Sequence, residues 1–232
     1  MKLLTEKELI WSTVVANNRM NRERRASGIN SYEHEIYFKP EQFLRTCIGR
    51  TGQGKWLDLC CGKGNALMQC AVDLAEHELQ NKAVLKGIDL IDEFQLIPPS
   101  ITCLKWEAAS VVDWIADDRY DLITCIHGLH YVGDKLRVLE MACGALTEHG
   151  RFVANIDLQN IKVSGSYLKD ILVKHGIMYD RKKKLLTCEG PRIIKFGLSF
   201  EGASDQAGPN YTGQEAVDAY YVNSSYGKQG CG

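Results

Sequence analysis

The sequence has no apolar run that approaches the roughly 20 residues needed to span a bilayer. Its net charge is only -1, so no overall field would draw the chain to nucleic acid or to an anionic membrane. Its first residues, MKLLTEKELIW, lack the basic start and the unbroken apolar core of a signal peptide. Internal repeats and low-complexity linkers are also missing. These absences predict a cytoplasmic protein that has no membrane partner.

Cysteine is plentiful, but the pattern of a disulfide framework is missing. The nine cysteines are an odd number, and most fall inside apolar runs, as Cys103, Cys125 and Cys143 do. Buried, reduced thiols of a cytosolic protein explain this pattern better than disulfides do. The length of 232 residues and the 45% hydrophobic content suffice for one α/β domain with an N-terminal extension, or for two small domains.

From Trp56 onward, short apolar strands alternate with helical periods. Apolar spacing predicts helices over residues 66–74 and 136–146. Strands with apolar residues on both faces, separated by helices, indicate a parallel sheet covered on both sides. We expect five such strands, at residues 55–61, 84–91, 101–108, 120–127 and 150–157.

The segments that flank this core are predicted from shorter signals. Ser164 is a suitable N-cap for a helix through residues 167–172. Around Gly190-Pro191, residues 183–190 and 192–202 suggest an antiparallel pair that closes the sheet, and a terminal helix is expected near residues 216–221. Before the core we expect a helix over residues 9–25, a polar turn and a second helix over 40–48. The predicted division is a helical extension or lid over 1–50, a core over 51–222 and a flexible tail over 223–232.

The stretch LDLCCGKGNAL, residues 57–67, joins the first strand to the first helix of the core. In a doubly wound sheet, ligands bind where the carboxyl ends of strands meet the following helices. Gly62 and Gly64 allow a ligand to approach the backbone closely. Adjacent Cys60 and Cys61 lack a second Cys/His pair for zinc, and they miss the C-x-x-C redox spacing. We therefore expect both thiols to be reduced and free of metal.

Two phosphate-binding motifs are also excluded at this turn. A P-loop requires Lys-Ser or Lys-Thr after the last glycine, where this sequence has Asn65. The dinucleotide fingerprint requires a third small residue at the position of Leu67. A nucleoside cofactor without a pyrophosphate is the ligand that remains.

The motif LDLCCGKG resembles the first motif of class I S-adenosylmethionine-dependent methyltransferases, and the resemblance extends over residues 56–157. The pieces NRMNRERRASG and GLHYVGDKL are similar to a group of bacterial small-molecule methyltransferases that mostly lack an assigned substrate. The resemblance implies an α/β fold with a doubly wound, mostly parallel seven-stranded sheet and helices on both faces. It also implies S-adenosylmethionine as the cofactor and S-adenosylhomocysteine as the product.

The same resemblance implies a set of cofactor-binding residues. Asp89, in KGIDLID, takes the place of the acid that holds the ribose hydroxyls, and one carboxylate can bond both of them. Cys60 stands where the family has its first glycine. The third-strand acid is missing, so Ser110 or the backbone at Ala109 would have to contact the adenine. The implied cofactor residues are Tyr32, Asp58, Cys60, Gly62, Gly64, Asp89, Leu90, Ala109, Ser110 and Ile126.

Two histidines follow the fourth strand, where this fold places substrate-contacting residues. His127 or His130 could remove a proton from a hydroxyl or an amine near neutral pH, with Tyr131 and Asp157 as substrate contacts. Alternatively, one histidine packs inward and plays no chemical part. The sequence IHGL at residues 126–129 differs from the Asn/Asp-Pro-Pro-aromatic tetrapeptide of enzymes that methylate adenine or cytosine amino groups.

The only basic clusters, at residues 22–25 and 181–184, have no aromatic platform beside them, so we expect no nucleic-acid partner. The polar loop at 205–214 either walls the substrate pocket or only connects two elements. We predict in-line transfer of a methyl group from S-adenosylmethionine to an oxygen or nitrogen of a small molecule. An NAD(P)-dependent Rossmann oxidoreductase and a catalytically silent cofactor-binding regulatory module are the alternatives. The acceptor and the oligomeric state stay open.

Overall fold

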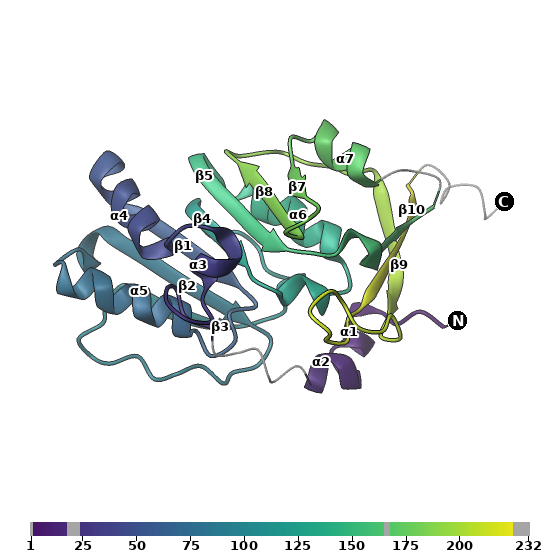
Figure 1. Cartoon of the computed structure of the whole chain (residues 1–232), viewed down its shortest axis with the longest axis horizontal. Helices are drawn as coiled ribbons and strands as arrows, with labels where there is room; N and C mark the ends of the chain where they lie inside the picture. The colour runs from purple at the N-terminus through teal and green to yellow at the C-terminus, as the bar shows by residue number, and fades with distance from the viewer. Residues whose placement is uncertain (1, 18–23, 165–167, 225–232) are drawn as a thin grey trace.

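The computed structural model describes residues 2–17, 24–164 and 168–224, and its main feature is a seven-stranded sheet (Figure 1). The strand order is β3-β2-β1-β4-β5-β8-β7. The pairs β3–β2, β2–β1, β1–β4 and β4–β5 are parallel, whereas β8 is antiparallel to both β5 and β7. The predicted doubly wound, mostly parallel seven-stranded sheet is therefore confirmed. Its strands are β1 Gly54–Leu59, β2 Ala83–Asp89, β3 Leu104–Ala108, β4 Tyr120–Cys125, β5 Leu146–Asn155, β7 Met178–Asp180 and β8 Leu185–Glu189.

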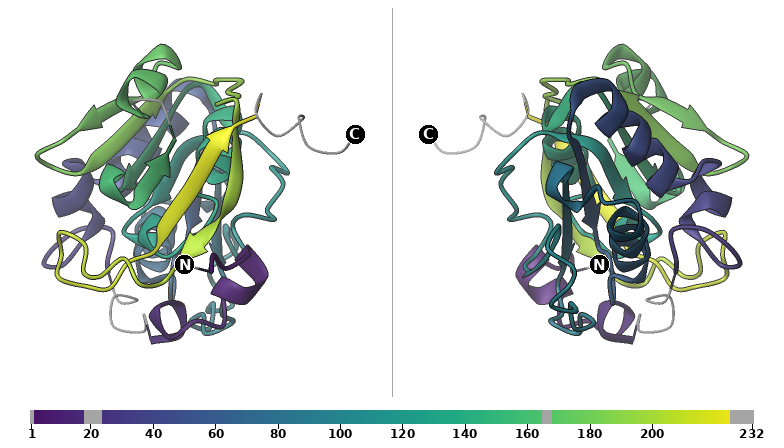
Figure 2. Two further views of the ribbon diagram at one scale, coloured as in Figure 1. Left: turned by 90° about the vertical axis from the view of Figure 1, so that its right-hand side faces the viewer. Right: turned by 90° about the vertical axis from the view of Figure 1, so that its left-hand side faces the viewer.

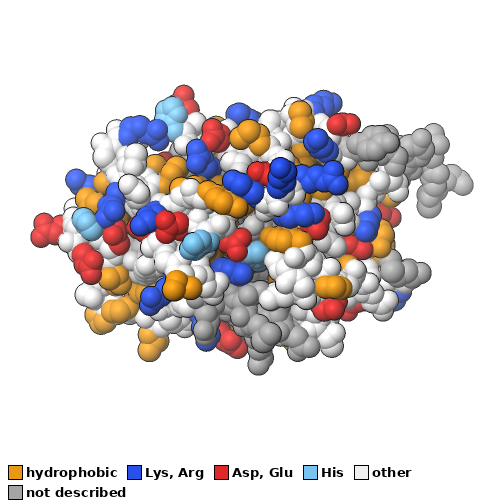
Figure 3. Space-filling view, in the orientation of Figure 1, with side chains coloured by type: hydrophobic (Ala, Val, Ile, Leu, Met, Phe, Trp, Pro, Cys, Tyr) orange, Lys and Arg blue, Asp and Glu red, His pale blue; other side chains and the backbone are white. Residues whose placement is uncertain are grey.

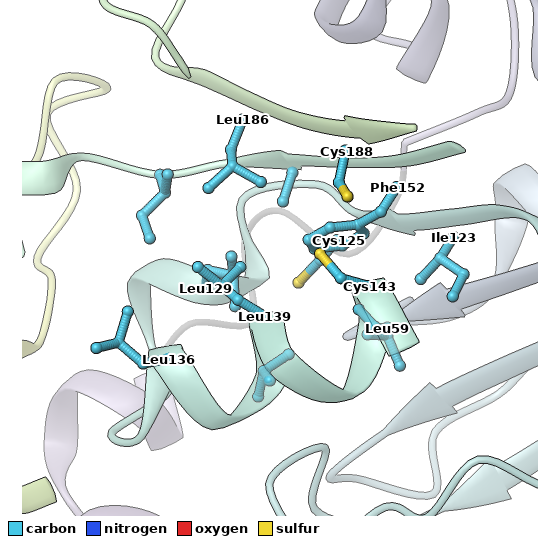
Figure 4. Packing of buried hydrophobic residues seen from close by; sticks show 14 of the residues in the cluster. Leu59, Ile123, Cys125, Leu129, Leu136, Leu139, Cys143, Phe152, Leu186 and Cys188 are labelled. Carbon is cyan, nitrogen blue, oxygen red and sulfur yellow. The ribbon is translucent and has the colours of Figure 1, made fainter. Parts of the chain in front are cut away.

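Helices cover both faces of this sheet. On one face, α4 (Pro40–Thr51) and α5 (Asn65–Glu76) pack with Trp56 and Leu85 into one apolar cluster. On the other face, α6 (Lys135–Gly144) packs against Leu59 and Phe152, as Figure 4 shows. Successive residues of a strand point to opposite faces, so neighbouring residues of β1 contribute to different clusters. Strands buried on both sides explain why the apolar runs of the core are nearly continuous.

All five predicted core strands are present, but four of them end two residues earlier than predicted. The strands β1, β2, β4 and β5 end at positions 59, 89, 125 and 155, not at 61, 91, 127 and 157. The order of the strands reverses between β1 and β4, and such a reversal opens a crevice at the carboxyl ends of the strands. The residues that leave these four strands early are therefore those that can turn toward the crevice.

The N-terminal segment is not one helix over residues 9–25 as predicted. It forms α1 (Glu6–Leu9) and α2 (Thr13–Asn17). The break has a local cause, because the Ser12 hydroxyl accepts a hydrogen bond from Val15 N at 3.4 Å and starts a new helix. Residues 18–23 of the prediction lie outside the described residues.

The remaining helices before the core are α3 (Tyr32–Ile36), which follows the predicted polar turn, and α4. The predicted helix over residues 40–48 is confirmed. Because α4 runs across position 50, the division of the chain at residues 50 and 51 stays a prediction. Short 3₁₀ turns complete the described helices: η1 Gln80–Lys82, η2 Gly128–His130 and η3 Leu158–Asn160.

A second, three-stranded sheet corrects two predictions. It contains β6 (Ile161–Val163), β10 (Asp218–Asn223) and β9 (Leu198–Ser204), in that order. Residues 192–202 do not pair with 183–190, because Gly190-Pro191 interrupts the ladder and Arg192 N bonds Cys143 O, which leads the chain away from the main sheet. The predicted helix over residues 216–221 is also wrong. Tyr220 and Tyr221 of this stretch, followed by Val222, have high β-propensity and lie in β10 between two partner strands.

The second sheet lies at one end of the molecule, beside the N-terminal helix (Figures 1 and 2). A bridge between Leu4 and Ala203 joins the N-terminal segment to β9. The helix α7 (Leu168–Lys174) lies where a helix was predicted through residue 172, but the residues between the proposed cap Ser164 and α7, including Tyr167, lie outside the described residues. No helix in the described part of the chain is long and apolar enough to cross a membrane. Acidic and basic side chains alternate over the face drawn in Figure 3.

Candidate active site

The turn that follows β1 has an unusual backbone. Gly62 and Gly64 have φ of 60° and 78°, and Cys60 has φ of 57°, a left-handed conformation that is uncommon for a residue with a Cβ. The Cys60 side chain occupies space that Gly128 leaves open, because a Cβ on Gly128 would lie 2.3 Å from the Cβ of Cys60. The cysteine at the position of the family's first glycine therefore keeps the glycine-like backbone and packs against a glycine after β4.

Gly64 is required for packing under the turn. A Cβ there would lie 2.2 Å from the ring of Trp106, and a Cβ on Gly87 would meet the same ring at 2.7 Å. Trp106 also stacks on Phe94, with ring centroids 5.3 Å apart, and its indole N–H donates to Gln95 O at 3.0 Å. The two glycines thus let a tryptophan from β3 support the turn from below.

Asp89, at the end of β2, is held with its carboxylate against the turn. Its Oδ2 accepts a hydrogen bond from Gly62 N at 2.8 Å, and its Oδ1 accepts one from Ile91 N at 3.3 Å. A carboxylate has about four lone-pair sites, so each oxygen keeps capacity for a ligand hydroxyl. This is the position that the resemblance predicts for the ribose-binding acid.

Asp58 is fully buried beneath the turn. Its Oδ2 accepts from the Tyr32 hydroxyl at 2.8 Å, and its Oδ1 accepts from the Thr124 hydroxyl at 2.6 Å. Trp56 Nε1 donates to the same Thr124 hydroxyl at 2.8 Å. Burial raises the pKa of Asp58 to about 7, against the opposing effect of the two hydrogen bonds. Asp58 therefore anchors Tyr32 and, through it, the start of α3.

One pocket lies over these residues. It holds about 970 Å³ of empty space, including the part open to solvent at its mouth, which is near the upper end of the roughly 300–1,000 Å³ of small-molecule sites. Nine predicted site residues line it: Tyr32, Cys60, Gly62, Asp89, Leu90, Ser110, Ile126, His127 and Tyr131. Five others do not line it: Asp58, Gly64, Ala109, His130 and Asp157.

The sequence did not point to several residues of the pocket wall. Glu6, Leu9, Ile10 and Val15 come from α1, α2 and the turn between them, and Arg24 belongs to the basic cluster at residues 22–25. These residues precede the core in the sequence, and the apolar periodicity that predicts the core gives no indication that they lie at the pocket. The one available signal is the polar segment before the core, which was expected to fold over the cofactor.

His127 is the pocket residue with the most constrained environment. It has φ of 61° and is only 4% exposed. Its Nε2 lies 2.9 Å from Oε1 of Glu35, and Arg24 Nε lies 3.8 Å from the same oxygen. Burial acts to raise the pKa of Glu35, but the hydrogen bond and charge of His127, with the charge of Arg24, bring that pKa below its ordinary value. A strained, buried histidine paired with a carboxylate is an arrangement found at catalytic sites.

A family model described as a methyltransferase domain matches residues 32–182, more than half of the chain. The chain belongs to this methyltransferase family. The match separates it from the NAD(P)-dependent oxidoreductases considered as an alternative. No curated protein matches the sequence.

Three solved structures illustrate what the methyltransferase is similar to. N-methyltransferase NodS from Bradyrhizobium japonicum WM9, in complex with S-adenosyl-L-homocysteine, is 15% identical over 65% of this chain and 84% of its own, with a TM-score of 0.40. DhpI, in a complex with SAH, is 16% identical over 69% and 86%, with a TM-score of 0.39. The sugar N-methyltransferase KedS8 from Streptoalloteichus sp ATCC 53650 is 21% identical over 56% of this chain, with a TM-score of 0.36. The methyltransferase spans half of the KedS8 chain, at 50%.

The second histidine of the methyltransferase has a different setting. His130 is fully buried, and neither ring nitrogen has a hydrogen-bond partner among the described residues. Burial, with a smaller effect from His127, lowers the pKa of His130 to about 3. The imidazole of His130 is therefore neutral across the physiological range and is a weak base.

The two predicted substrate residues are already engaged. The Tyr131 hydroxyl donates to Oε1 of Gln214 at 2.8 Å, which ties the wall of the pocket to the loop at residues 205–214. Asp157 caps η3, where its Oδ1 accepts from Gln159 N at 3.2 Å and pairs with Lys184 Nζ at 3.0 Å. Tyr131 thus faces the pocket, whereas Asp157 stabilises the backbone after β5.

Proposed function

We propose that this methyltransferase uses S-adenosylmethionine to methylate an oxygen or nitrogen of a small molecule, with His127 as the base. One observation supports this most directly: Asp89 and His127 line the same pocket, together with residues 60–62 of the turn after β1. Asp89 suits a ligand with paired hydroxyls, and His127 suits an acceptor that must lose a proton.

The residues present fit the cofactor. Asp89 would hold the ribose hydroxyls, the backbone at Gly62 would approach the amino-acid portion, and Ser110 with Ile126 would flank the adenine. When bound, S-adenosylmethionine supplies a methyl group whose carbon bonds to the acceptor as its bond to sulfur breaks, with the electron pair remaining on the product thioether. S-adenosylhomocysteine is then the product. The pocket residues position the acceptor in line, which supplies much of the rate enhancement.

The contact with Glu35 sets the protonation of His127. An ionised carboxylate only accepts hydrogen bonds, so the Nε2 that faces Glu35 must carry a proton. In the neutral ring this leaves Nδ1 as the basic nitrogen, able to take the proton of the acceptor hydroxyl or amine. The negative charge of Glu35 then stabilises the imidazolium that forms. His130, with its pKa lowered to about 3, is the weaker candidate for this step.

A calorimetric titration with S-adenosylhomocysteine tests the cofactor assignment. Asp89→Ala should weaken binding by about 1.5–3 kcal/mol, because a hydrogen bond to a charged group is lost. Asp92→Ala is the matched control, since Asp92 is an exposed carboxylate three residues further along the chain. The wild type should bind S-adenosylhomocysteine and not NADH. Absence of any heat with the wild type, or equal loss in both variants, would contradict the proposal.

A further inference from the structure

Beside His127 lie buried polar groups that nothing in the described structure satisfies. His130 is 0% exposed and Asn155 is 1% exposed. Both ring nitrogens of His130 and both amide atoms of Asn155 lack a hydrogen-bond partner within the described residues. Buried polar groups normally have partners, and leaving them without one costs free energy. Two such side chains next to the proposed base call for a ligand that pairs with them.

His130 belongs to an aromatic cluster, which we define as His127, His130, Tyr131 and Tyr211. The ring centroid of His130 lies 6.0 Å from that of His127, 6.4 Å from that of Tyr131 and 5.5 Å from that of Tyr211. The first three residues follow β4, and Tyr211 comes from the loop at residues 205–214. Rings at these distances form a surface that favours a flat, conjugated partner.

Asn155 ends β5, the neighbour of β4 in the sheet, and so lies beside this cluster. Burial raises the pKa of Tyr211 and acts in the same direction on Glu35, and the nearby Asn155 amide weakly opposes this effect on the pKa of both groups. Neither amide atom reaches hydrogen-bonding geometry with them. An amide offers one acceptor and two donors, so its best complement is a group with a donor and an acceptor side by side.

The acidic groups around the cluster are already paired, and the Lys135 ammonium, which acts on His130 electrostatically, is fully buried with its Nζ donating to Val132 O. Glu35 is paired with His127 and Arg24, and Asp157 is paired with Lys184. A charged acceptor would lose its hydration there without gaining a free counter-charge. Glu6, which also lines the pocket, accepts hydrogen bonds from Gly133 N and Asp134 N.

We infer that the aromatic cluster and Asn155 form the acceptor site, and that the acceptor is an uncharged aromatic hydroxyl compound carrying a carboxamide-like donor–acceptor group. This inference rests on the proposed methyltransferase function. His127 faces the hydroxyl, while Asn155 and His130 pair with the amide-like group. Neither His130 nor Asn155 lines the pocket in this structure, so the acceptor reaches them by displacing the ring of Tyr211, a residue that is 41% exposed, and then packs against His127, His130 and Tyr131.

Three probe compounds of the same shape test the charge of the acceptor. These are 3-hydroxybenzamide, 3-hydroxybenzoate and 3-(aminomethyl)phenol, each incubated with the full chain and isotopically labelled S-adenosylmethionine. We expect the neutral amide to be methylated with kcat/KM at least tenfold above the anion and the cation. A preference for either charged probe overturns the inference, and the cation would then point to Glu6.

Two substitutions test the residues. Asn155→Leu and His130→Leu replace unpaired polar groups with apolar ones, so stability should hold or rise. If these groups bind the acceptor, kcat/KM for 3-hydroxybenzamide should fall at least tenfold while S-adenosylhomocysteine affinity stays within twofold. Trp114→Phe is the matched control, because it removes a buried, unpaired N–H outside the cluster and should leave methyl transfer unchanged.

The outcomes separate this inference from the proposed function. Retention of the wild-type rate in both leucine variants shows that the groups play no part in acceptor binding. Failure of all three probes, with intact binding of S-adenosylhomocysteine, overturns the acceptor class and leaves the methyltransferase assignment standing. If S-adenosylhomocysteine itself does not bind, the proposed function fails and the inference fails with it.

Discussion

At the end of the pocket formed by β1 and β2, the polar groups are satisfied by the protein itself. Both oxygens of Asp89 accept backbone hydrogen bonds, and Asp58 accepts from Tyr32 and Thr124. Beside the pocket, after β4 and at the end of β5, the side-chain polar atoms of His130 and Asn155 have no hydrogen-bond partner in the described chain. The difference teaches that the groups proposed to hold the cofactor are already satisfied by the protein, whereas the groups proposed to hold the acceptor still have unused hydrogen-bonding capacity.

Removal of His127, the proposed base, should have the largest effect, because it should abolish the function of one end of the pocket and leave the other end intact. His127→Ala should lower turnover by roughly 10²–10⁴-fold, because proton removal by a positioned side chain contributes that much. Affinity for S-adenosylhomocysteine, measured by calorimetry, should stay within twofold. His149→Ala, at an exposed histidine, is the control. A parallel loss of cofactor affinity would show that the two ends are not separable.

The pH dependence of the free energy of unfolding tests the buried carboxyl group at the β1 end. The folded-state pKa of Asp58 is raised from 3.8 to about 7, so its protonated form is favoured in the folded state. Its stabilising contribution is complete below about pH 4 and is lost as pH rises through about 7. Relative to Asp58→Asn, the wild type should lose on the order of 4 kcal/mol over this range.

Denaturant unfolding between pH 4 and 8 measures this loss. The exposed Asp92→Asn is the control, and it should follow the wild type. Identical pH profiles for the wild type and Asp58→Asn would rule out a raised pKa at Asp58.

The smallest expected effect concerns the contact between the two ends, where Cys60 meets Gly128. Gly128→Ala should destabilise the fold by about 1–3 kcal/mol, because its Cβ would strike the Cys60 side chain. Cys60→Gly alone should cost little, since glycine adopts positive φ freely. The double variant should recover part of the loss, although the Sγ of Cys125 would still lie 3.0 Å from the new Cβ. Strict additivity of the two free energies of unfolding would disprove the contact.

The core of the fold could be predicted because each strand carries a continuous apolar signal of its own. The errors at residues 192–202 and 216–221 have a different origin. A six-residue stretch such as residues 216–221 fits both a helical and a strand period. The strand conformation of β10 depends on its pairing with β6 and β9, which come from other parts of the sequence. Partner choice across such distances leaves no local signal.

The residues of the site also divide into those that the sequence predicts and those that it does not. Asp89 and the turn at residues 60–64 are predictable because a motif carries them in consecutive residues. The pair of Glu35 and His127 joins residues 92 positions apart and depends on how α3 packs over β4. The apolar character of Ile126 and Ile156 also extended the predicted strands, although both residues lie beyond the strand ends, where Ile126 lines the pocket and Ile156 packs in the core.

The packing of Cys60 against Gly128 bears on how relatives of this enzyme can be recognised. A search pattern written for the turn alone scores Cys60 as a defect. When positions 60 and 128 are considered together, the side chain present at position 60 fills the space that the glycine at position 128 leaves free. We therefore expect a search pattern that pairs a cysteine after β1 with a glycine after β4 to find enzymes whose glycine-rich motif looks incomplete. The same pattern should exclude chains that have lost the turn itself.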